Sequence, residues 1–278
     1  MKKAAIPHPV KTVGVVGAGR MGTPIIGHLV RKEFTTRVFD LDATRAGAVK
    51  KLGARWAASP ESLAAGCEAI LVCVGFDREV RELLAKGAPL RKAKPGTIVA
   101  ILSTIHPTTV QKLAKACEGA GLHVVDSTVC RGGEAADSGT LLSFVGGGAE
   151  VVERLTPVLR AYSSDVVHTG GVGTAQVAKA VNNLILWACL VADHEGLALA
   201  QRYGADVEAL RRALLMSSCA NGPLEKWGSQ TMAWAEDDMA IVAEMAAEAG
   251  IALPQAGVNR EICRALKPRR HKLESYGR

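Results

Sequence analysis

A cluster of three glycines near the N-terminus constrains the fold of this 278-residue chain more than any other feature. It reads Gly17-Ala18-Gly19-Arg20-Met21-Gly22 and directly follows the β-branched run 12–16. Residues 21–31 then have the apolar spacing of a helix. A strand that turns into a helix through G-x-G-x-x-G is typical of a dinucleotide-binding βαβ unit, because the glycines allow a tight turn and close approach to a pyrophosphate. We therefore predict residues 17–22 as cofactor-binding residues.

Short β-branched runs alternate with longer helical patterns up to about residue 170. The predicted strands are residues 12–16, 36–40, 69–74, 97–102, 123–126, 142–145 and 166–168. The amphipathic stretches between them include residues 79–86, 107–119 and 150–161. This alternation predicts an α/β fold with a doubly wound, mostly parallel sheet that carries helices on both faces.

The pattern changes after Gly173. Residues 174–202 form one long apolar-periodic stretch, and helical patterns also cover residues 206–216, 222–229, 236–249 and 254–266. No strand is expected after residue 170. We therefore predict two domains, an α/β domain over residues 1–171 and an all-helical domain over residues 172–278, joined by the long helix.

Composition argues against several classes of protein. The seven cysteines form no C-x-x-C pair and lie mostly in apolar stretches, which predicts reduced thiols in a cytoplasmic protein. The seven histidines are scattered singly, so no metal site is predicted. The longest apolar run, residues 184–192, is far shorter than the roughly 20 residues of a membrane span. We interpret it as a buried helix segment.

The net charge of +7 does not indicate a nucleic-acid partner. Residues 264–278 contain six basic side chains and one acidic side chain, so most of the excess charge belongs to the C-terminal segment. We interpret that segment as a solvated tail and not as a nucleic-acid-binding arm.

Asp40, at the end of the second predicted strand, is the residue expected to distinguish NAD from NADP. A carboxylate there can accept hydrogen bonds from the ribose hydroxyls and repels a 2′-phosphate, so NAD is favoured. Arg45 or Lys50 could still bind that phosphate, and NADP therefore stays open. Val74, Ser103 and Thr104 are further candidates for cofactor contact, because they come where neighbouring strands end. Residues 103–107 could equally be only the cap of the following helix.

Lys179 and Asn183 are the candidate catalytic pair. Their i, i+4 spacing on the long predicted helix places them on the same face, one turn apart. A glycine-rich turn at residues 170–173 precedes the helix, and Thr174 is the candidate N-cap. The positive helix end, a positively charged nicotinamide and desolvation all disfavour the ammonium, so the amine could act as a base near neutral pH. The alternative, a solvated helix face, is opposed by the apolar residues around the pair.

Taken together, the motifs resemble those of the β-hydroxyacid dehydrogenase family, which includes 3-hydroxyisobutyrate dehydrogenases and tartronate semialdehyde reductases. The family's substrate loop, D-A-P-V-S-G-G followed by A-x-x-G-T-L, is similar to residues 126–132 followed by Ala136, Gly139, Thr140 and Leu141. The family's helix motif, G-x-G-x-x-x-x-x-K-x-x-x-N, is matched by Gly171, Gly173, Lys179 and Asn183, and its S-T loop by Ser103 and Thr104. The similarity covers nearly the whole chain.

The resemblance implies a Rossmann domain followed by a helical domain that forms dimers or tetramers. It also implies a dehydrogenase that transfers hydride between NAD(P) and a small β-hydroxy acid, with Lys179 as general acid/base and Asn183 positioning the substrate. Backbone N–H groups of the substrate loop would receive the substrate carboxylate. The substrate-binding residues implied in this way are Val129, Cys130, Arg131 and Gly132.

Two departures from the family's pattern bear on the substrate. Cys130-Arg131 replaces Ser-Gly, so a serine hydroxyl is lost, and the Arg131 guanidinium could bind a carboxylate or only fill space. Asp237 replaces a lysine that lies near cofactor and substrate, whereas Asp238 keeps the family's residue and is predicted to contact the cofactor. One hypothesis is that Arg131 supplies the positive charge missing at residue 237.

Two other functions stay open from the sequence. An imine reductase would share this architecture, but those enzymes generally lack the catalytic lysine, so Lys179 counts against it. A non-catalytic dinucleotide-binding interaction module would agree with the two departures, but the intact pair of Lys179 and Asn183 opposes it. We expect an NAD-preferring oxidoreductase with a small carboxylate-bearing substrate and no membrane or nucleic-acid partner.

Overall fold

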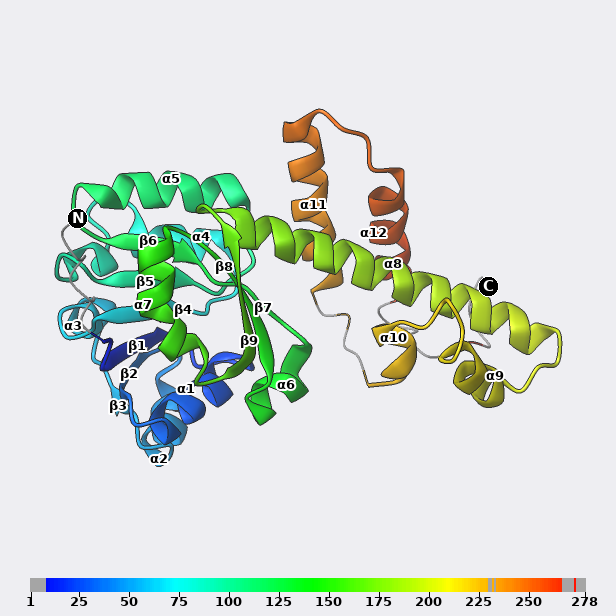
Figure 1. The fold of residues 1–278 in the computed structure, drawn as a ribbon, viewed down its shortest axis with the longest axis horizontal. Coiled ribbons are helices and arrows are strands. Elements are labelled where there is room, and N and C mark those ends of the chain that lie inside the picture. Colours follow the sequence, from blue (N-terminus) through cyan, green and yellow to red (C-terminus); the bar gives the residue numbers. More distant parts are fainter. Residues whose placement is uncertain (1–8, 230–231, 233, 267–272, 274–278) are drawn as a thin grey trace, which may run out of the picture. The chain divides into compact units, whose positions relative to one another are not determined.

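The structure of the protein is a computed structural model, which describes residues 9–229, 232, 234–266 and 273. It divides into two compact units, residues 1–179 and residues 180–278 (Figure 1). The domain limits predicted from the sequence, with a boundary after residue 171, stay a prediction. Most of the basic C-terminal segment interpreted as a tail, residues 267–272 and 274–278, lies outside the described residues.

The first unit is built on a twisted sheet whose strands are mostly parallel (Figure 1). The described strands are β1 (Thr12–Val16), β2 (Thr35–Phe39), β3 (Arg55–Trp56), β4 (Ala69–Val72), β5 (Ile98–Ile101), β6 (His123–Asp126), β7 (Val129–Cys130), β8 (Leu141–Gly146) and β9 (Ser163–Gly170). Their order is β3-β2-β1-β4-β5-β6-β8-β7, with β9 paired to β8. Neighbours from β3 to β6 are parallel, whereas β8 runs antiparallel to β6 and β7. The predicted doubly wound sheet is confirmed.

The helices of the first unit connect these strands. They are α1 (Gly22–Arg31), α2 (Ala46–Lys51), α3 (Pro60–Ala64), α4 (Asp77–Leu84), α5 (Pro107–Glu118), α6 (Gly132–Ser138) and α7 (Ala149–Leu159). The sequence did not predict α2, α3 and α6, nor the strands β3 and β7. Each of these elements is too short to show a helical or strand period.

The central strands are buried on both faces, which explains their continuous apolar runs. Val13 and Val15 of β1 belong to an apolar cluster that includes residues of α1 and α7. Val16 belongs to a second cluster, formed with residues of α3, α4 and α5. Alternate residues of β4 and β5 are divided between the same two clusters, as the two-residue period of a strand requires. The sheet therefore lies between two helical layers.

The second unit is helical in every element that the structure describes after Gly170. The long helix α8 (Thr174–Arg202) is followed by α9 (Val207–Leu214), α10 (Gly222–Glu225), α11 (Ala235–Ala249) and α12 (Pro254–Leu266). One apolar cluster joins α8, α11 and α12 and includes Trp187, Leu190, Met239 and Cys263. The all-helical prediction for this part of the chain is confirmed.

Helix α8 is long and apolar enough to span a membrane, by length and composition alone. The core helix of a water-soluble protein passes the same test, so this is weak evidence. Within the run 184–192, interpreted as buried, Trp187 and Leu190 are buried but Ile185 is 58 % exposed. The interpretation therefore holds for one face of the helix, because only that face packs against α11 and α12.

Candidate functional site

The predicted dinucleotide cradle lies at the carboxyl end of β1. Gly17 has a φ of 101°, and a Cβ atom there would overlap the carbonyl oxygen of Cys73 at the end of β4. A Cβ atom on Gly22 would overlap the carbonyl oxygen of Gly17. Glycine is therefore required at both positions. The cradle formed in this way suits a pyrophosphate, which needs close approach to backbone N–H groups at a helix N-terminus.

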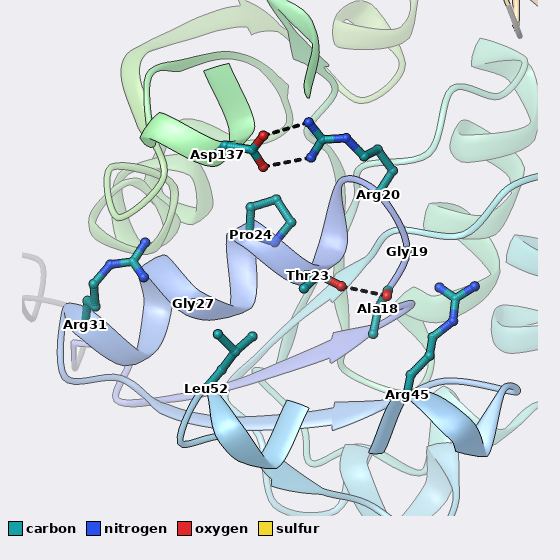
Figure 2. A pocket seen from close by; sticks show the side chains of 10 residues that line it. All are labelled: Ala18, Gly19, Arg20, Thr23, Pro24, Gly27, Arg31, Arg45, Leu52 and Asp137. Carbon is teal, nitrogen blue, oxygen red and sulfur yellow. Dashed lines mark hydrogen bonds and ion pairs between the residues drawn. The ribbon is translucent and has the colours of Figure 1, made fainter. Parts of the chain in front are cut away.

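A groove of about 580 Å³ adjoins this cradle (Figure 2). Its lining includes Arg20, Arg31 and Arg45, so its charge suits phosphate groups. Arg20 forms a bidentate pair with Asp137, with both nitrogen–oxygen distances at 2.7 Å. This pair links the cradle to α6, the helix that follows the predicted substrate loop.

Asp40 occupies the position expected of the ribose-binding acid. Its Oδ2 accepts a hydrogen bond from the Ala18 N–H group at 2.6 Å, and its Oδ1 accepts one from the Asp42 N–H group at 2.8 Å. The Arg45 guanidinium lies 3.5 Å from Asp40 Oδ2 and 3.2 Å from Asp42 Oδ2. Hydrogen bonds from Thr44 and Arg45 hold the pKa of the Asp42 carboxyl below its ordinary value. Arg45 is thus already paired with two carboxylates.

Two apolar residues near the cradle escaped prediction from the sequence. Leu41, directly after Asp40, is 84 % exposed, and Phe76, in the loop after β4, is 55 % exposed. Both follow strands that flank β1, at the edge of the sheet where ligands bind in folds of this kind. The signal that identifies these two residues is their exposure to solvent, which can be seen only in the folded chain.

Val74 and Ser103 lie together at the ends of β4 and β5, and their contact with the cofactor stays a prediction. Ser103 Oγ accepts a hydrogen bond from the Val74 N–H group at 3.0 Å and donates one to the Val74 carbonyl at 2.8 Å. His106 is the N-cap of α5, where its Nδ1 accepts a hydrogen bond from the Thr108 N–H group. The segment 103–107 therefore both joins two strand ends and caps a helix.

Lys179 lies against the predicted substrate loop. Its Nζ donates a hydrogen bond to the Val129 carbonyl at 2.8 Å and lies 3.9 Å from the Cys130 sulfur. The amine is partly buried, and it sits in the second turn of α8. The structure thus brings together the predicted proton-transfer group and the strand β7 that carries predicted substrate-binding residues.

The N-terminus of α8 is capped by Asp126, and the prediction of Thr174 as N-cap is wrong. Asp126 accepts hydrogen bonds from the Gly173 N–H group at 2.7 Å and the Gln176 N–H group at 2.9 Å. Thr174 is the first residue of the helix, and its hydroxyl donates to the Gly171 carbonyl. The capping acid lies 47 residues before Gly173, a distance at which local sequence patterns give no signal.

Arg131 is directed to the edge of the sheet. It has a φ of 84°, in the left-handed region. Its Nη1 donates to the Thr140 carbonyl at 3.1 Å, Ser164 Oγ at 2.9 Å and Asp165 Oδ2 at 2.7 Å. These bonds help to hold the pKa of the Asp165 carboxyl below its ordinary value. Since the guanidinium is engaged there, the structure gives no support to the hypothesis that it supplies a charge to the substrate.

Asn183 and Asp238 belong to the second unit. Asn183 is buried, and its Oδ1 accepts a hydrogen bond from Asn182 Nδ2 at 2.9 Å. Asp238 lies in the first turn of α11, where its Oδ2 accepts a hydrogen bond from the Trp187 indole at 3.0 Å. The roles predicted for Asn183 toward substrate and for Asp238 toward cofactor stay predictions.

Two family models together match nearly the whole chain. Residues 12–171 match the NAD binding domain of 6-phosphogluconate dehydrogenase. Residues 173–274 match the NAD-binding domain of NADP-dependent 3-hydroxyisobutyrate dehydrogenase.

Similar proteins of known name agree with these matches. The NAD-dependent L-serine dehydrogenase of Pseudomonas aeruginosa is 31 % identical over 78 % of this chain and 73 % of its own length. The 3-hydroxyisobutyrate dehydrogenase of the same organism is 32 % identical over 76 % of this chain and 72 % of its own length. The structure of Mycobacterium tuberculosis 3-hydroxyisobutyrate dehydrogenase with L-serine has a TM-score of 0.85 at 23 % identity and covers 94 % of each chain.

The cradle geometry predicts that a single methyl group will abolish tight dinucleotide binding. In Gly22→Ala the added Cβ overlaps the Gly17 carbonyl, so the turn must open. We expect NAD affinity, measured by isothermal titration calorimetry, to fall at least tenfold. Gly47→Ala is the matched control, because a Cβ atom on that α2 residue meets nothing within 4 Å. Equal affinities for the two variants would contradict the assigned cradle.

Proposed function

The chain belongs to the β-hydroxyacid dehydrogenase family, and we propose that it oxidises the hydroxyl group of a small β-hydroxy acid with NAD as the hydride acceptor. Its membership makes it an NAD(P)-dependent oxidoreductase that acts on a CH–OH group. 3-Hydroxyisobutyrate and L-serine, the compounds in its relatives' names, are both carboxylates with a hydroxyl group on the β-carbon. We propose a substrate of that class.

The observation that carries the proposal is the position of the Lys179 amine. It lies 2.8 Å from the Val129 carbonyl, so it is held beside the loop whose backbone is proposed to receive the substrate carboxylate. A bound nicotinamide would supply the hydride chemistry. The neutral amine of Lys179 would take the hydroxyl proton during oxidation and return it during reduction. The Val129 carbonyl directs the amine by accepting one of its N–H groups.

The position of the Lys179 amine also favours a hydroxy-acid dehydrogenase over the two alternative functions, an imine reductase and a non-catalytic module. An imine reductase has no need for a lysine base aimed at a hydroxyl, and a non-catalytic module has no need to hold a partly buried amine on the loop. A panel of hydroxy acids, alcohols and amines, each assayed for NAD or NADP turnover, separates the three functions. Turnover confined to hydroxy acids is the outcome that supports the proposal.

Replacement of the proposed base should reduce turnover while leaving cofactor binding intact. We expect Lys179→Ala to lower kcat roughly 10²- to 10⁴-fold, because proton transfer then depends on water. NAD affinity should stay within about threefold of the wild type. Lys115→Ala, on the exposed surface of α5, is the matched loss of a lysine and should retain wild-type kcat. Full turnover by Lys179→Ala would refute the proposed role.

The preference for NAD over NADP is proposed from the cluster of Asp40, Asp42 and Arg45. A 2′-phosphate would meet the Asp40 carboxylate, and the charge of Arg45 is already shared between two carboxylates. Asp40→Ser removes the repulsion and releases Arg45 from one partner. We expect the ratio of NAD to NADP affinity, measured by calorimetry, to fall at least tenfold. Asp42→Ser, the control that releases Arg45 from its other partner, should change the ratio much less.

Assembly of the enzyme into homodimers or homotetramers is also proposed, supported by an exposed apolar stripe on α8. The stripe comprises Val181, Ile185 and Leu199, which are 50 %, 58 % and 59 % exposed. Exposed apolar side chains that line one face of a helix are typical of an interface between subunits.

A charge within this stripe should weaken the assembly. We expect Ile185→Asp to give a smaller mass than the wild type in size-exclusion chromatography with light scattering. Gln201→Asp, which places the same charge on an exposed polar position of α8, is the control. A wild-type mass equal to that of one chain would rule out this part of the proposal.

A further inference from the structure

Asp126 is a fully buried acid at the end of β6 that no proposed step of the reaction uses directly. Both of its carboxylate oxygens accept hydrogen bonds from the start of α8, at 2.7 and 2.9 Å. A Cβ atom on Gly146 would lie 2.6 Å from Asp126 Oδ1 and 2.7 Å from the Gly171 carbonyl oxygen, so no side chain fits between the acid and the glycine turn. The acid is therefore held tightly against the first turn of the helix that carries Lys179.

Gln176 ties the same turn to a second strand. Its side chain is 1 % exposed, and both ends of its amide are used. Oε1 accepts a hydrogen bond from the Ile105 N–H group at 3.0 Å, and Nε2 donates one to the Ser103 carbonyl at 2.8 Å. Gln176 thus fixes α8 to the segment after β5, which carries the predicted cofactor-binding residues Ser103 and Thr104.

These contacts determine where the Lys179 amine can reach. Lys179 follows Gln176 by three residues, which is about 4.5 Å along the helix axis. The Thr128 hydroxyl donates a hydrogen bond to the Ala175 carbonyl at 3.0 Å, so the segment after β6 also holds the helix. The Lys179 amine then meets the Val129 carbonyl. A small rotation or shift of the first turn would move the amine by a comparable amount.

A buried carboxylate is a costly way to cap a helix, because an exposed serine or threonine could accept the same N–H groups. Burial raises the pKa of the Asp126 carboxyl, while the backbone N–H groups act in the opposite direction and favour its charged form. The acid therefore serves to fix the first turn of α8 from the buried interior of the first unit.

We propose that Asp126 and Gln176 are the positioning residues for Lys179: together they fix the first turn of α8 so that the amine reaches the hydroxyl of the substrate. The proposal rests on the proposed function, in which Lys179 transfers the hydroxyl proton. Neither residue is required to touch substrate or cofactor. Both act through the helix that they hold.

The test compares Asp126→Asn and Gln176→Met with the wild-type enzyme, using NAD and the hydroxy acid that the wild type oxidises fastest. We expect both variants to lower kcat roughly 10- to 100-fold, because a misplaced base slows proton transfer. NAD affinity should change less than about threefold. The deuterium isotope effect on kcat, with deuterium on the carbon that bears the hydroxyl, should rise because oxidation becomes more rate-limiting. Loss of folded protein alone would not raise it.

Thr174→Val is the matched control, because it alters a hydrogen-bonding side chain in the same turn without changing Asp126 or Gln176. It should keep kcat within about threefold of the wild type. An unchanged kcat and isotope effect in Gln176→Met would overturn the proposal, as would the same result in a folded Asp126→Asn variant. If Asp126→Asn fails to fold, the isotope effect of Gln176→Met decides. The proposed function fails in a different way, through absence of hydroxy-acid turnover in the wild type or full turnover in Lys179→Ala.

Discussion

The hydrogen bond between the Lys179 amine and the Val129 carbonyl is the contact on which the site depends. At 2.8 Å it joins the start of α8 to the short strand β7, which are 50 residues apart in the sequence. An amine held by a carbonyl has one N–H group committed and keeps its remaining capacity for a substrate. Orientation of this kind is a large part of what a protein adds to cofactor chemistry.

The parallel sheet makes this contact possible. The strands β1, β2, β4, β5 and β6 run in the same direction, so the residues that follow them gather at one edge. Asp40 follows β2, the glycine cradle follows β1, and Ser103 comes shortly after β5. Asp126, at the end of β6, extends the same edge to the first turn of α8. The same sheet thus positions the predicted cofactor-binding residues and the helix that carries Lys179.

Arg131 illustrates how a departure from a family pattern can be accommodated by contacts within the protein. A non-glycine residue in the left-handed region costs roughly 1–2 kcal/mol. Here the side chain bonds to the Thr140 carbonyl, Ser164 and Asp165 at the edge formed by β8 and β9. Because that ion pair is partly exposed, it offsets the backbone cost only in part. Cys130 is the other residue of this loop that departs from the family's pattern. Its sulfur lies 3.9 Å from the Lys179 Nζ, so the thiol is the changed group that lies nearest to the proposed base.

The sequence by itself determined the doubly wound sheet, the helical region after Gly173, the glycine cradle and the placing of Lys179 on a long helix. These features are encoded by local patterns: a two-residue period, a 3.6-residue period or a fixed glycine spacing. Such patterns can be recognised in the sequence without the fold. Only the tertiary structure decided that Asp126 caps α8, that Gln176 braces it and that Arg131 turns to the sheet edge. Those choices depend on which side chains meet across distances of tens of residues, and a buried hydrogen bond between distant segments leaves no periodic trace in the sequence.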